Sequence, residues 1–417
     1  MIQEEERSEY RERVLLVAVQ LPNRPEVEPL LRELGELAET AGGEVVGTLV
    51  QPKERIDPGT YLGSGKIEEL RELVYETNAD TVITDDELSP AQQKNLERAL
   101  DVKVLDRTGV ILDIFAAHAR TSEGKLQVEL AQLRYNLSRL SGQGTALSRL
   151  GGGIGTRGPG EKKLEQDRRA VRNRIGQLRR ELEDVVTHRE LNRKERQKKG
   201  VPVAAIVGYT NAGKSTLLNT LTDAGILAED KLFATLDTTT RALELPGKQQ
   251  ILLTDTVGFI RKLPTELIRA FRSTLEEAAY ADYLIHVVDA SDPEWETYRK
   301  TVYETLDLLE IREKPVLTVF NKMDLVEGET HFLDDRAEKT VKISAKSGEG
   351  LDGLQEALSE LLRGGKKKLA MTLPFDRMSL LAEIRRKGEL QVEDYRDDGV
   401  YVEAYVPADL YGRIVRK

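Results

Sequence analysis

Short apolar runs that alternate with helical stretches constrain the fold of this chain more strongly than any other feature. Residues 200–365 contain the runs VPVAAIVG, QQILLTDT, DYLIHVVD, PVLTVFNK and TVKISAKS, each followed by loop and helix signals. Repetition of strand, loop and helix is typical of a parallel sheet covered by helices. We therefore expect an α/β domain over this range.

A second series of the same kind lies nearer the start of the chain. The runs VLLVAVQL, EVVGTLVQ, DTVITDDE and VKVLDRTG alternate with amphipathic stretches that begin near Val27, Lys66 and Pro90. This spacing predicts a small parallel α/β unit within residues 1–109.

Residues 110–199 have a helical pattern instead. Leucines recur at alternating steps of four and three, at Leu126, Leu130, Leu133, Leu137 and Leu140. A similar apolar series follows downstream, at Leu164, Val171, Ile175, Leu178, Leu182 and Val185. Such seams pair helices, so we predict an antiparallel hairpin whose arms are each about 35 residues, or roughly 50 Å, long.

A glycine-rich segment, residues 141–161, separates the two arms. Its glycines exclude a helix, and it is longer than helix hairpins need for a turn, which favours a functional loop over a simple connection. The second arm is rich in Lys and Arg although the whole chain has a net charge of −10. A solvated helix face is the alternative, but the surplus favours a nucleic-acid contact through Arg149, Arg157, Lys162 and Lys163.

The end of the chain and its composition complete this outline. Residues 366–417 read as strand, helix, two strands and a short helix, which predicts a small α+β domain. The chain has no cysteine, and its four histidines lack ligand spacing, which excludes disulfides, thiol nucleophiles and Cys-ligated metals. The acidic, polar start resembles no targeting peptide, and no apolar run could cross a bilayer, so we expect a cytoplasmic protein.

The segment Gly208-Tyr-Thr-Asn-Ala-Gly213-Lys214-Ser215 fits the pattern G-x-x-x-x-G-K-[ST] between a strand and a helix. Its glycines allow backbone amides to turn around phosphates, Lys214 neutralises the β and γ oxygens, and the Ser215 hydroxyl can ligate Mg²⁺. This context predicts a phosphate-binding loop.

The segment LLTDTVGF places Asp255 at the end of the next apolar strand, followed by Thr256, Val257 and Gly258. Asp255 can hold Mg²⁺ through water, and the Gly258 amide can reach the γ-phosphate. The pattern D-x-x-G is weak alone but strong in register after a phosphate-binding loop.

Base recognition is predicted for Asn321-Lys322-Met323-Asp324 at the end of PVLTVF. A carboxylate at Asp324 can accept two hydrogen bonds from N1 and N2 of guanine, and adenine offers no matching pair of donors. Ser344-Ala345-Lys346 follows another strand and can close over the base. The motifs together predict GTP as the nucleotide.

These motifs, with FATLD, resemble those of translation-factor-type GTPases and specifically the HflX family of ribosome-binding GTPases. YLGSGK (61–66), the arm with its GGGIGTRGPGE loop and FATLDTTTR (233–241) are similar to HflX features as well. The resemblance implies an α/β fold in which a P-loop GTPase domain (200–365) follows an N-terminal α/β subdomain (1–109) and the helical hairpin (110–199), and precedes the α+β domain (366–417).

The resemblance also implies a role for the FATLD segment. Thr235 becomes the second Mg²⁺ ligand and the residue that senses the γ-phosphate, and it joins Lys214 and Gly258 as a catalytic residue. The residues expected to contact GTP or GDP are Gly208, Tyr209, Thr210, Asn211, Ala212, Gly213, Lys214, Ser215, Thr216, Phe233, Ala234, Thr235, Leu236, Asp237, Asp255, Thr256, Val257, Gly258, Asn321, Lys322, Met323, Asp324, Ser344, Ala345 and Lys346.

Two positions bear on the hydrolysis step. Ras-like enzymes position the attacking water with a glutamine just after D-x-x-G, but this chain has Phe259 there, which predicts slow intrinsic hydrolysis unless another side chain substitutes. Asn211 resembles the asparagine of potassium-assisted GTPases, which implies a K⁺ ion beside Mg²⁺; a local capping role is the alternative.

The resemblance implies a monomeric Mg²⁺-dependent GTPase that binds the large ribosomal subunit and its rRNA in the GTP form, with a role in ribosome splitting, recycling or rescue. The alternatives are a ribosome-assembly GTPase, an ATP-dependent rRNA-remodelling enzyme that uses the N-terminal region, and a nucleotide-gated binding module. A second phosphate loop at 63–66 is disfavoured against a structural turn or RNA-contact loop, because the residue five positions before Gly65 is Thr60.

Overall fold

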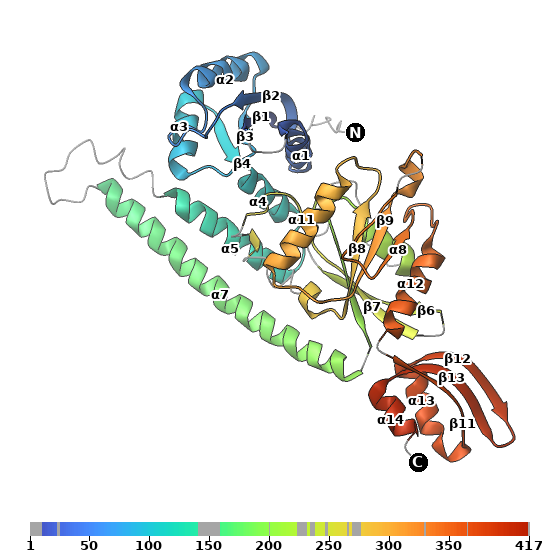
Figure 1. Ribbon diagram of the computed structural model, residues 1–417. Coiled ribbons are helices and arrows are strands. Elements are labelled where there is room, and N and C mark those ends of the chain that lie inside the picture. The colour runs from blue at the N-terminus through green and yellow to red at the C-terminus, as the bar shows by residue number, and fades with distance from the viewer. Residues whose placement is uncertain are drawn as a thin grey trace, which may run out of the picture. The chain divides into compact units, whose positions relative to one another are not determined.

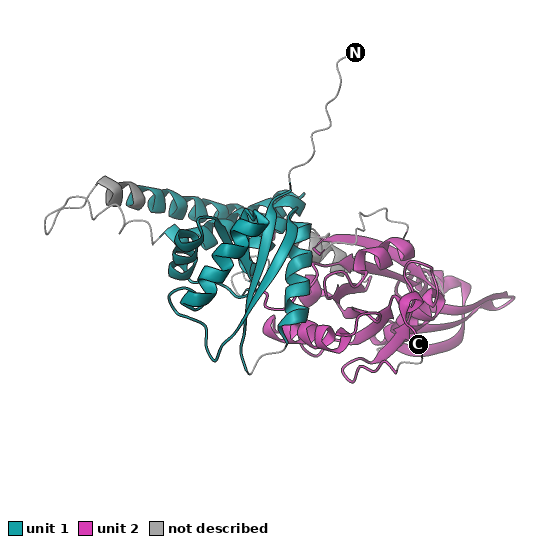
Figure 2. Cartoon of the chain, turned by 90° about the horizontal axis from the view of Figure 1, so that it is seen from above, with its two compact units in different colours: residues 1–185, 264–270 teal, residues 186–263, 271–417 magenta. Residues whose placement is uncertain are grey.

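A computed structural model describes most of the chain. The described residues are 11–22, 26–140, 159–199, 201–222, 232–233, 238–246, 249–264, 267–268, 277–328, 331–364 and 366–415, without the side chains of 159–164 and 188–199. The chain divides into two compact units, residues 1–185 with 264–270 and residues 186–263 with 271–417 (Figure 2).

The first unit contains a parallel sheet of the order β2-β1-β3-β4 (Figure 1). Its strands are β1 (Arg13–Gln20), β2 (Glu44–Pro52), β3 (Thr81–Thr84) and β4 (Lys103–Asp106). Helices α1 (Val27–Thr40), α2 (Ser64–Thr77) and α3 (Pro90–Leu100) connect them. Apolar side chains from β1, β3, α2 and α3 form one buried core, so the predicted strand and helix alternation is confirmed.

The strands β3 and β4 end earlier than expected, and helix α4 (Arg107–His118) begins before residue 110. For β4 and α4 the cause is Asp106, whose carboxylate accepts a hydrogen bond from the Gly109 backbone N–H at 2.9 Å and so caps the helix. An aspartate in this position stabilises the first turn of a helix. The run VKVLDRTG is therefore half strand and half helix.

The hairpin consists of α5 (Ser122–Arg139) and the long helix α7 (Pro159–Lys199). Leu130, Ile175 and Leu178 are buried where the two helices pack, and most of the predicted seam surrounds them. Arg174 and Glu129 add a hydrogen-bonded ion pair at 2.7 Å. The predicted pairing is confirmed over the residues whose side chains are described.

The expected length of the first arm is wrong, because α5 has 18 residues and α7 has 41. The helical arm is interrupted between α4 and α5. There the Thr121 hydroxyl accepts a hydrogen bond from Gly124 N–H at 3.0 Å and caps the start of a new helix. Helix α7 begins at Pro159, so the expectation that no part of 141–161 is helical is wrong for residues 159–161, where a proline occupies the first helical turn that suits it. The rest of the glycine-rich tip, with Arg149 and Arg157, lies outside the described residues.

The second unit contains a six-stranded sheet of the order β10-β9-β8-β5-β7-β6 (Figure 1). Its strands are β5 (Val203–Gly208), β6 (Thr239–Leu245), β7 (Gln249–Asp255), β8 (Tyr283–Asp289), β9 (Val316–Asn321) and β10 (Lys339–Lys342). The helices are α8 (Lys214–Thr222), α11 (Trp295–Leu308) and α12 (Leu351–Arg363). The parallel strands β5, β7, β8, β9 and β10 end at one edge, where the sequence motifs follow them.

The edge strand β6 is not among the expected strands. It pairs antiparallel with β7, from Thr239 opposite Asp255 to Leu245 opposite Gln249. Only two of its seven side chains are buried, so it lacks the continuous apolar run by which the interior strands can be recognised.

The last residues form an antiparallel sheet of the order β11-β13-β12, with its own buried core. Its elements are β11 (Lys366–Leu373), α13 (Met378–Lys387), β12 (Glu389–Arg396), β13 (Gly399–Pro407) and α14 (Ala408–Val415). This order of elements is the predicted one. Among the described helices of the whole chain, none is long and apolar enough to span a membrane.

Candidate nucleotide-binding site

The loop between β5 and α8 is held against the segment that follows β7. Thr210 N–H donates to the Phe259 carbonyl at 2.8 Å, and Phe259 N–H donates to the Gly208 carbonyl at 3.0 Å. Below this bridge, the Thr256 hydroxyl donates to the Ile206 carbonyl at 2.7 Å. The two phosphate motifs of the sequence therefore form one rigid backbone surface.

Two glycines, Gly213 in the phosphate loop and Gly258 after β7, occupy positions that a side chain could not share. Gly213 has φ of +90°, and a Cβ there would lie 2.3 Å from Nδ2 of Asn321. A Cβ on Gly258 would lie 2.9 Å from Cγ2 of Thr210 and 3.0 Å from Nζ of Lys214. Both glycines therefore permit a close approach of backbone that side chains would prevent.

Lys214 lies in this loop as a buried cation. Its Nζ donates to the Tyr209 carbonyl at 2.6 Å, and burial lowers its pKa to about 8, with Asp255 opposing the shift and Lys322 adding to it. A buried ammonium is stabilised by a neighbouring anion. The terminal phosphates of a nucleotide would supply that charge.

Ser215 and Asp255 form the candidate metal site. The Ser215 hydroxyl donates to Oδ2 of Asp255 at 2.6 Å, and Asp255 is fully buried at the end of β7. A hydroxyl and a carboxylate are hard oxygen donors, which Mg²⁺ prefers, so these residues fit the ion. The third expected ligand, Thr235, lies outside the described residues.

Asn321 joins the base-recognition motif to the phosphate loop. Its Nδ2 donates to the Ala212 carbonyl at 2.9 Å, and its Oδ1 accepts from Ala345 N–H at 2.9 Å. The Met323 N–H donates to the Ile343 carbonyl, which holds the two base motifs together. One buried amide thus contacts the segments around the phosphates and the base.

The rest of this motif is oriented by backbone geometry and one ion pair. Lys322 has φ of 63°, and its Nζ lies 2.8 Å from Oδ2 of Asp289. Asp324 follows on a short 3₁₀ turn and is exposed, as an acceptor for an incoming base requires. Ser344 is buried, and its hydroxyl accepts from Ser347 N–H at 3.2 Å.

The described residues therefore bring together the motifs that the sequence placed at strand ends. Asn211 has φ of 61° inside the loop, and Phe233 is buried with φ of 55°. The expected contacts that lie outside the described residues are Ala234, Thr235, Leu236 and Asp237.

Sequence reasoning missed three contributors to this site, namely Tyr298, Arg261 and Asp289. The predicted residue Tyr209 stacks on Tyr298 of α11 with ring centroids 4.1 Å apart, and its phenol oxygen accepts from Arg261 N–H at 2.8 Å. Asp289 anchors Lys322. The available signal for Asp289 was its place at the end of DYLIHVVD, which matches that of Asp255 in LLTDT; no local signal marked Tyr298 or Arg261.

The segment 61–66 has the geometry of a structural turn. Gly63 N–H donates to Oε1 of Gln51 at 2.9 Å, and the Tyr61 phenol donates to Oδ2 of Asp86 at 2.9 Å. Nζ of Lys66 pairs with Glu69 one helical turn away, at 2.7 Å. The Gly63 N–H and the Lys66 ammonium, which a phosphate loop would turn towards a nucleotide, thus have protein partners, which favours the turn over a second phosphate loop.

Comparison with known proteins agrees with this geometry. Residues 28–116, 118–196 and 203–322 match family models described as the N-terminal region of a GTP-binding GTPase, the middle region of a GTP-binding GTPase, and a 50S ribosome-binding GTPase. The GTPase HflX of Lacrimispora saccharolytica is 58% identical over 98% of this chain and 97% of its own. This chain belongs to the HflX GTPase family.

Other HflX proteins agree over the same span. The HflX of Caldanaerobacter subterraneus is 50% identical over 98% of this chain and 94% of its own, and that of Escherichia coli is 42% identical over 94% and 93%. A GDP-bound GTP-binding protein of Sulfolobus solfataricus is 26% identical over 84% of this chain and 98% of its own, with a TM-score of 0.45. As an HflX protein, the chain is a GTP hydrolase.

Proposed function

We propose that this HflX protein binds the large ribosomal subunit in its GTP form and acts in ribosome splitting, recycling or rescue. The observation that carries the proposal is the setting of Phe259. Its side chain is buried, and both its backbone polar groups are bonded to the phosphate loop. The Phe259 side chain therefore cannot orient a water molecule for attack, so we expect slow intrinsic hydrolysis unless another side chain substitutes, and an external activator that raises the rate.

The large subunit is the activator that the comparisons support, since the matched GTPase family carries 50S binding in its description. Differential binding of the GTP state by that partner would shift the population of the switch segments and raise the rate. We place this activity in the cytoplasm, where the partner is, and expect the protein to act as a monomer.

Within the site, each residue has a separate proposed role in binding the nucleotide. Lys214 exchanges its bond to the Tyr209 carbonyl for phosphate oxygens, and the Gly258 N–H donates to the γ-phosphate. Ser215 and Thr235, with Asp255 through water, would hold Mg²⁺, which would neutralise developing phosphate charge when bound. Asp324 accepts from the guanine, and Thr235 reports the γ-phosphate.

The helical arm supports an RNA contact. On α7, the apolar seam is buried while Arg169, Arg172, Arg179 and Arg180 are exposed. Exposed arginines in a chain with a net charge of −10 favour localised, salt-sensitive docking on phosphates over general RNA affinity. The further proposed contacts are Arg149, Arg157, Lys162 and Lys163.

The direct test is hydrolysis of GTP and ATP with and without purified large subunits. The parent chain, a variant with residues 142–160 shortened, and the double variant Arg172→Glu, Arg179→Glu are compared with the control Lys368→Glu, Arg386→Glu, whose residues are exposed at the other end of the chain. We expect strong stimulation for the parent and the control, and its loss in both arm variants. Brisk GTP turnover without subunits, or equal stimulation of all variants, would contradict the proposal.

Three further experiments distinguish the proposed function from its alternatives. Preferential binding to immature particles over mature ribosomes would indicate an assembly role, and ATP turnover that survives Lys214→Ala would indicate RNA remodelling. Release of the protein from the ribosome that is unchanged with a non-hydrolysable GTP analogue would indicate a nucleotide-gated binding module.

We also propose that a K⁺ ion binds at Asn211. An Asn211→Ala variant should lose any difference between the GTP hydrolysis rates measured in K⁺ and in Na⁺.

A further inference from the structure

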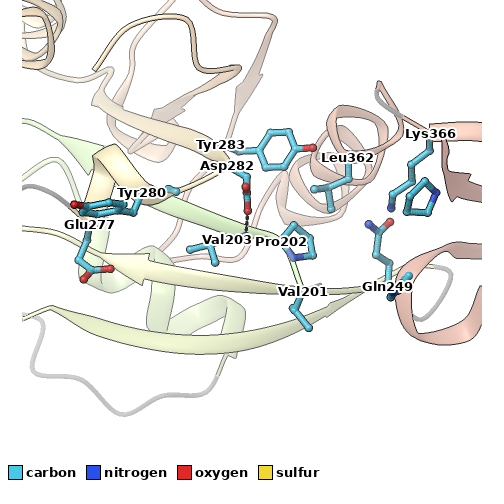
Figure 3. A pocket seen from close by; sticks show the side chains of 13 residues that line it. Val201, Pro202, Val203, Gln249, Glu277, Tyr280, Asp282, Tyr283, Leu362 and Lys366 are labelled. Carbon is cyan, nitrogen blue, oxygen red and sulfur yellow. Dashed lines mark hydrogen bonds between the residues drawn. The ribbon is translucent and has the colours of Figure 1, made fainter. Parts of the chain in front are cut away.

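A cavity opens at the edge of the six-stranded sheet that lies opposite the nucleotide site. It lies at the amino ends of β5, β7 and β8, where they meet α12 and the last sheet, and has a volume of about 340 Å³ (Figure 3). Cavities of this size accommodate small organic molecules. The nucleotide motifs follow the carboxyl ends of the same strands, so this cavity is separate from the GTP site.

Two polar atoms in the cavity have no hydrogen-bond partner among the described residues. They are Nζ of Lys366, at the start of β11, and Oε1 of Gln249, at the start of β7. Gln249 is only 4% exposed. Figure 3 shows both side chains at one end of the cavity, with Glu277 and Tyr280 at the other. A buried donor and a buried acceptor without partners are unfavourable unless a ligand or water satisfies them.

The charge of Lys366 is not balanced by a hydrogen-bonded carboxylate. Glu389 is within electrostatic reach, but both its oxygens bond to the Arg363 guanidinium, one of them at 2.7 Å. Lys387 lines the same cavity and adds positive charge. This end of the cavity therefore favours an anion.

We propose that this cavity binds a small organic carboxylate that carries an N–H group next to the carboxylate carbon, as an N-acylated amino acid does. The carboxylate accepts from Nζ of Lys366, and the N–H donates to Oε1 of Gln249. Pro202, Tyr283 and Leu362 offer an apolar wall to the body of the ligand (Figure 3).

The acceptor on Gln249 distinguishes this ligand from an oxyanion that carries no proton. A sulfate dianion would satisfy Lys366 but would place a second oxygen near an amide oxygen that needs a donor. A neutral amide would satisfy Gln249 but would leave the ammonium without an anion. A ligand with both groups satisfies both atoms at once.

The test is calorimetric titration of the GDP-bound full-length chain with N-acetyl-leucine and N-acetyl-phenylalanine, and with their C-terminal amides. We expect saturable binding of the carboxylates and none of the amides. Lys366→Met removes a charge-assisted bond and should weaken binding about 10- to 100-fold. The matched control is Lys368→Met, an exposed lysine on the same strand, which should bind as the parent does.

The pH dependence gives a second readout. Burial lowers the pKa of Lys366 to about 8, and a bound carboxylate favours the charged form, so binding should weaken as the pH rises through 8 and should take up protons there. Bonding to Glu389 raises the pKa of Arg363, so that group stays charged throughout. The charged and titratable groups around Lys366 are Glu389, Arg363, Lys387, Asp282 and Tyr283.

The site is independent of GTP hydrolysis, so Lys366→Met should retain the parent's basal GTPase rate, which also shows that the variant folds. Failure of both N-acetyl amino acids to bind saturably at millimolar concentration would overturn the proposal. Equal binding by the amides, or by Lys366→Met, would overturn it as well. The outcome does not depend on ribosome binding, and the two proposals therefore fail separately.

Discussion

The phenol oxygen of Tyr209 accepts a hydrogen bond from the backbone N–H of Arg261 at 2.8 Å. Tyr209 belongs to the phosphate loop, and Arg261 follows the D-x-x-G motif. The Tyr209 ring also stacks on Tyr298 of α11 at 4.1 Å. One side chain thus ties the phosphate loop both to the segment that follows the D-x-x-G motif and to helix α11.

Removing this bond should loosen the segment. Tyr209→Phe keeps the ring stacking but leaves a buried N–H without its acceptor, which costs about 1–3 kcal/mol. We expect a lower midpoint of thermal unfolding in the GDP-bound protein. The control Tyr401→Phe removes a half-buried phenol that donates to the side chain of Glu403, so no buried backbone group loses its partner and the midpoint should change little. An unchanged midpoint for Tyr209→Phe would show that this hydrogen bond does not stabilise the folded protein.

Asn321 offers a sharper test of how the motifs are assembled. Asn321→Ala removes the bonds to the Ala212 carbonyl and the Ala345 N–H, so the phosphate loop and the base loop lose their common support. We expect GDP affinity to fall about 10- to 100-fold, measured with a fluorescent GDP analogue. Asn95→Ala, which removes a bond to the Gly59 carbonyl in the other unit, is the control and should leave the affinity unchanged.

Asp324 should decide the choice of base without contributing to folding. Because it is exposed, Asp324→Asn should leave the unfolding midpoint nearly unchanged. It replaces an acceptor pair by an amide that can donate to a carbonyl, so GTP affinity should fall about 100-fold or more while xanthosine triphosphate gains. Competition binding with both nucleotides measures the ratio; a parallel loss of both affinities would contradict the assigned role.

His286 predicts a pH dependence of stability. Burial lowers its pKa to about 4, against about 6.5 for an unfolded imidazole, with Asp334 opposing the shift. The unfolded chain therefore binds more protons between these values, so stability is complete above pH 6.5 and falls towards pH 4 by up to about 1.4 kcal/mol per pH unit.

The variant His286→Phe lacks this titration and should show a shallower loss of stability over that range, measured by denaturant unfolding at several pH values. His331→Gln changes an exposed histidine and should follow the parent curve. Oδ2 of Asp334 lies 3.9 Å from Nδ1 of His286, and the Asp334 carboxylate is also bonded to Thr318 and Tyr303, so the difference between the two curves reports the titration of His286 together with its effect on Asp334. Identical slopes for parent and His286→Phe would refute the assignment.

Most of the nucleotide site could be predicted from the sequence because each motif is local. Asp255, Asn321 and the loop before Lys214 all follow apolar strands, and parallel strands bring their carboxyl ends to one edge. The hairpin seam was equally readable, since helical periodicity places Leu130, Ile175 and Leu178 on matching faces. In these cases, residues near one another in the chain carry the information.

Only the tertiary structure decided what joins these local pieces. The bond from Asn321 to Ala212, the stacking of Tyr209 on Tyr298 and the cavity that holds Lys366 beside Gln249 connect residues far apart in the chain. The edge strand β6 depends on pairing with β7. Sequence patterns report which face of an element is apolar, whereas these contacts depend on where separate elements meet.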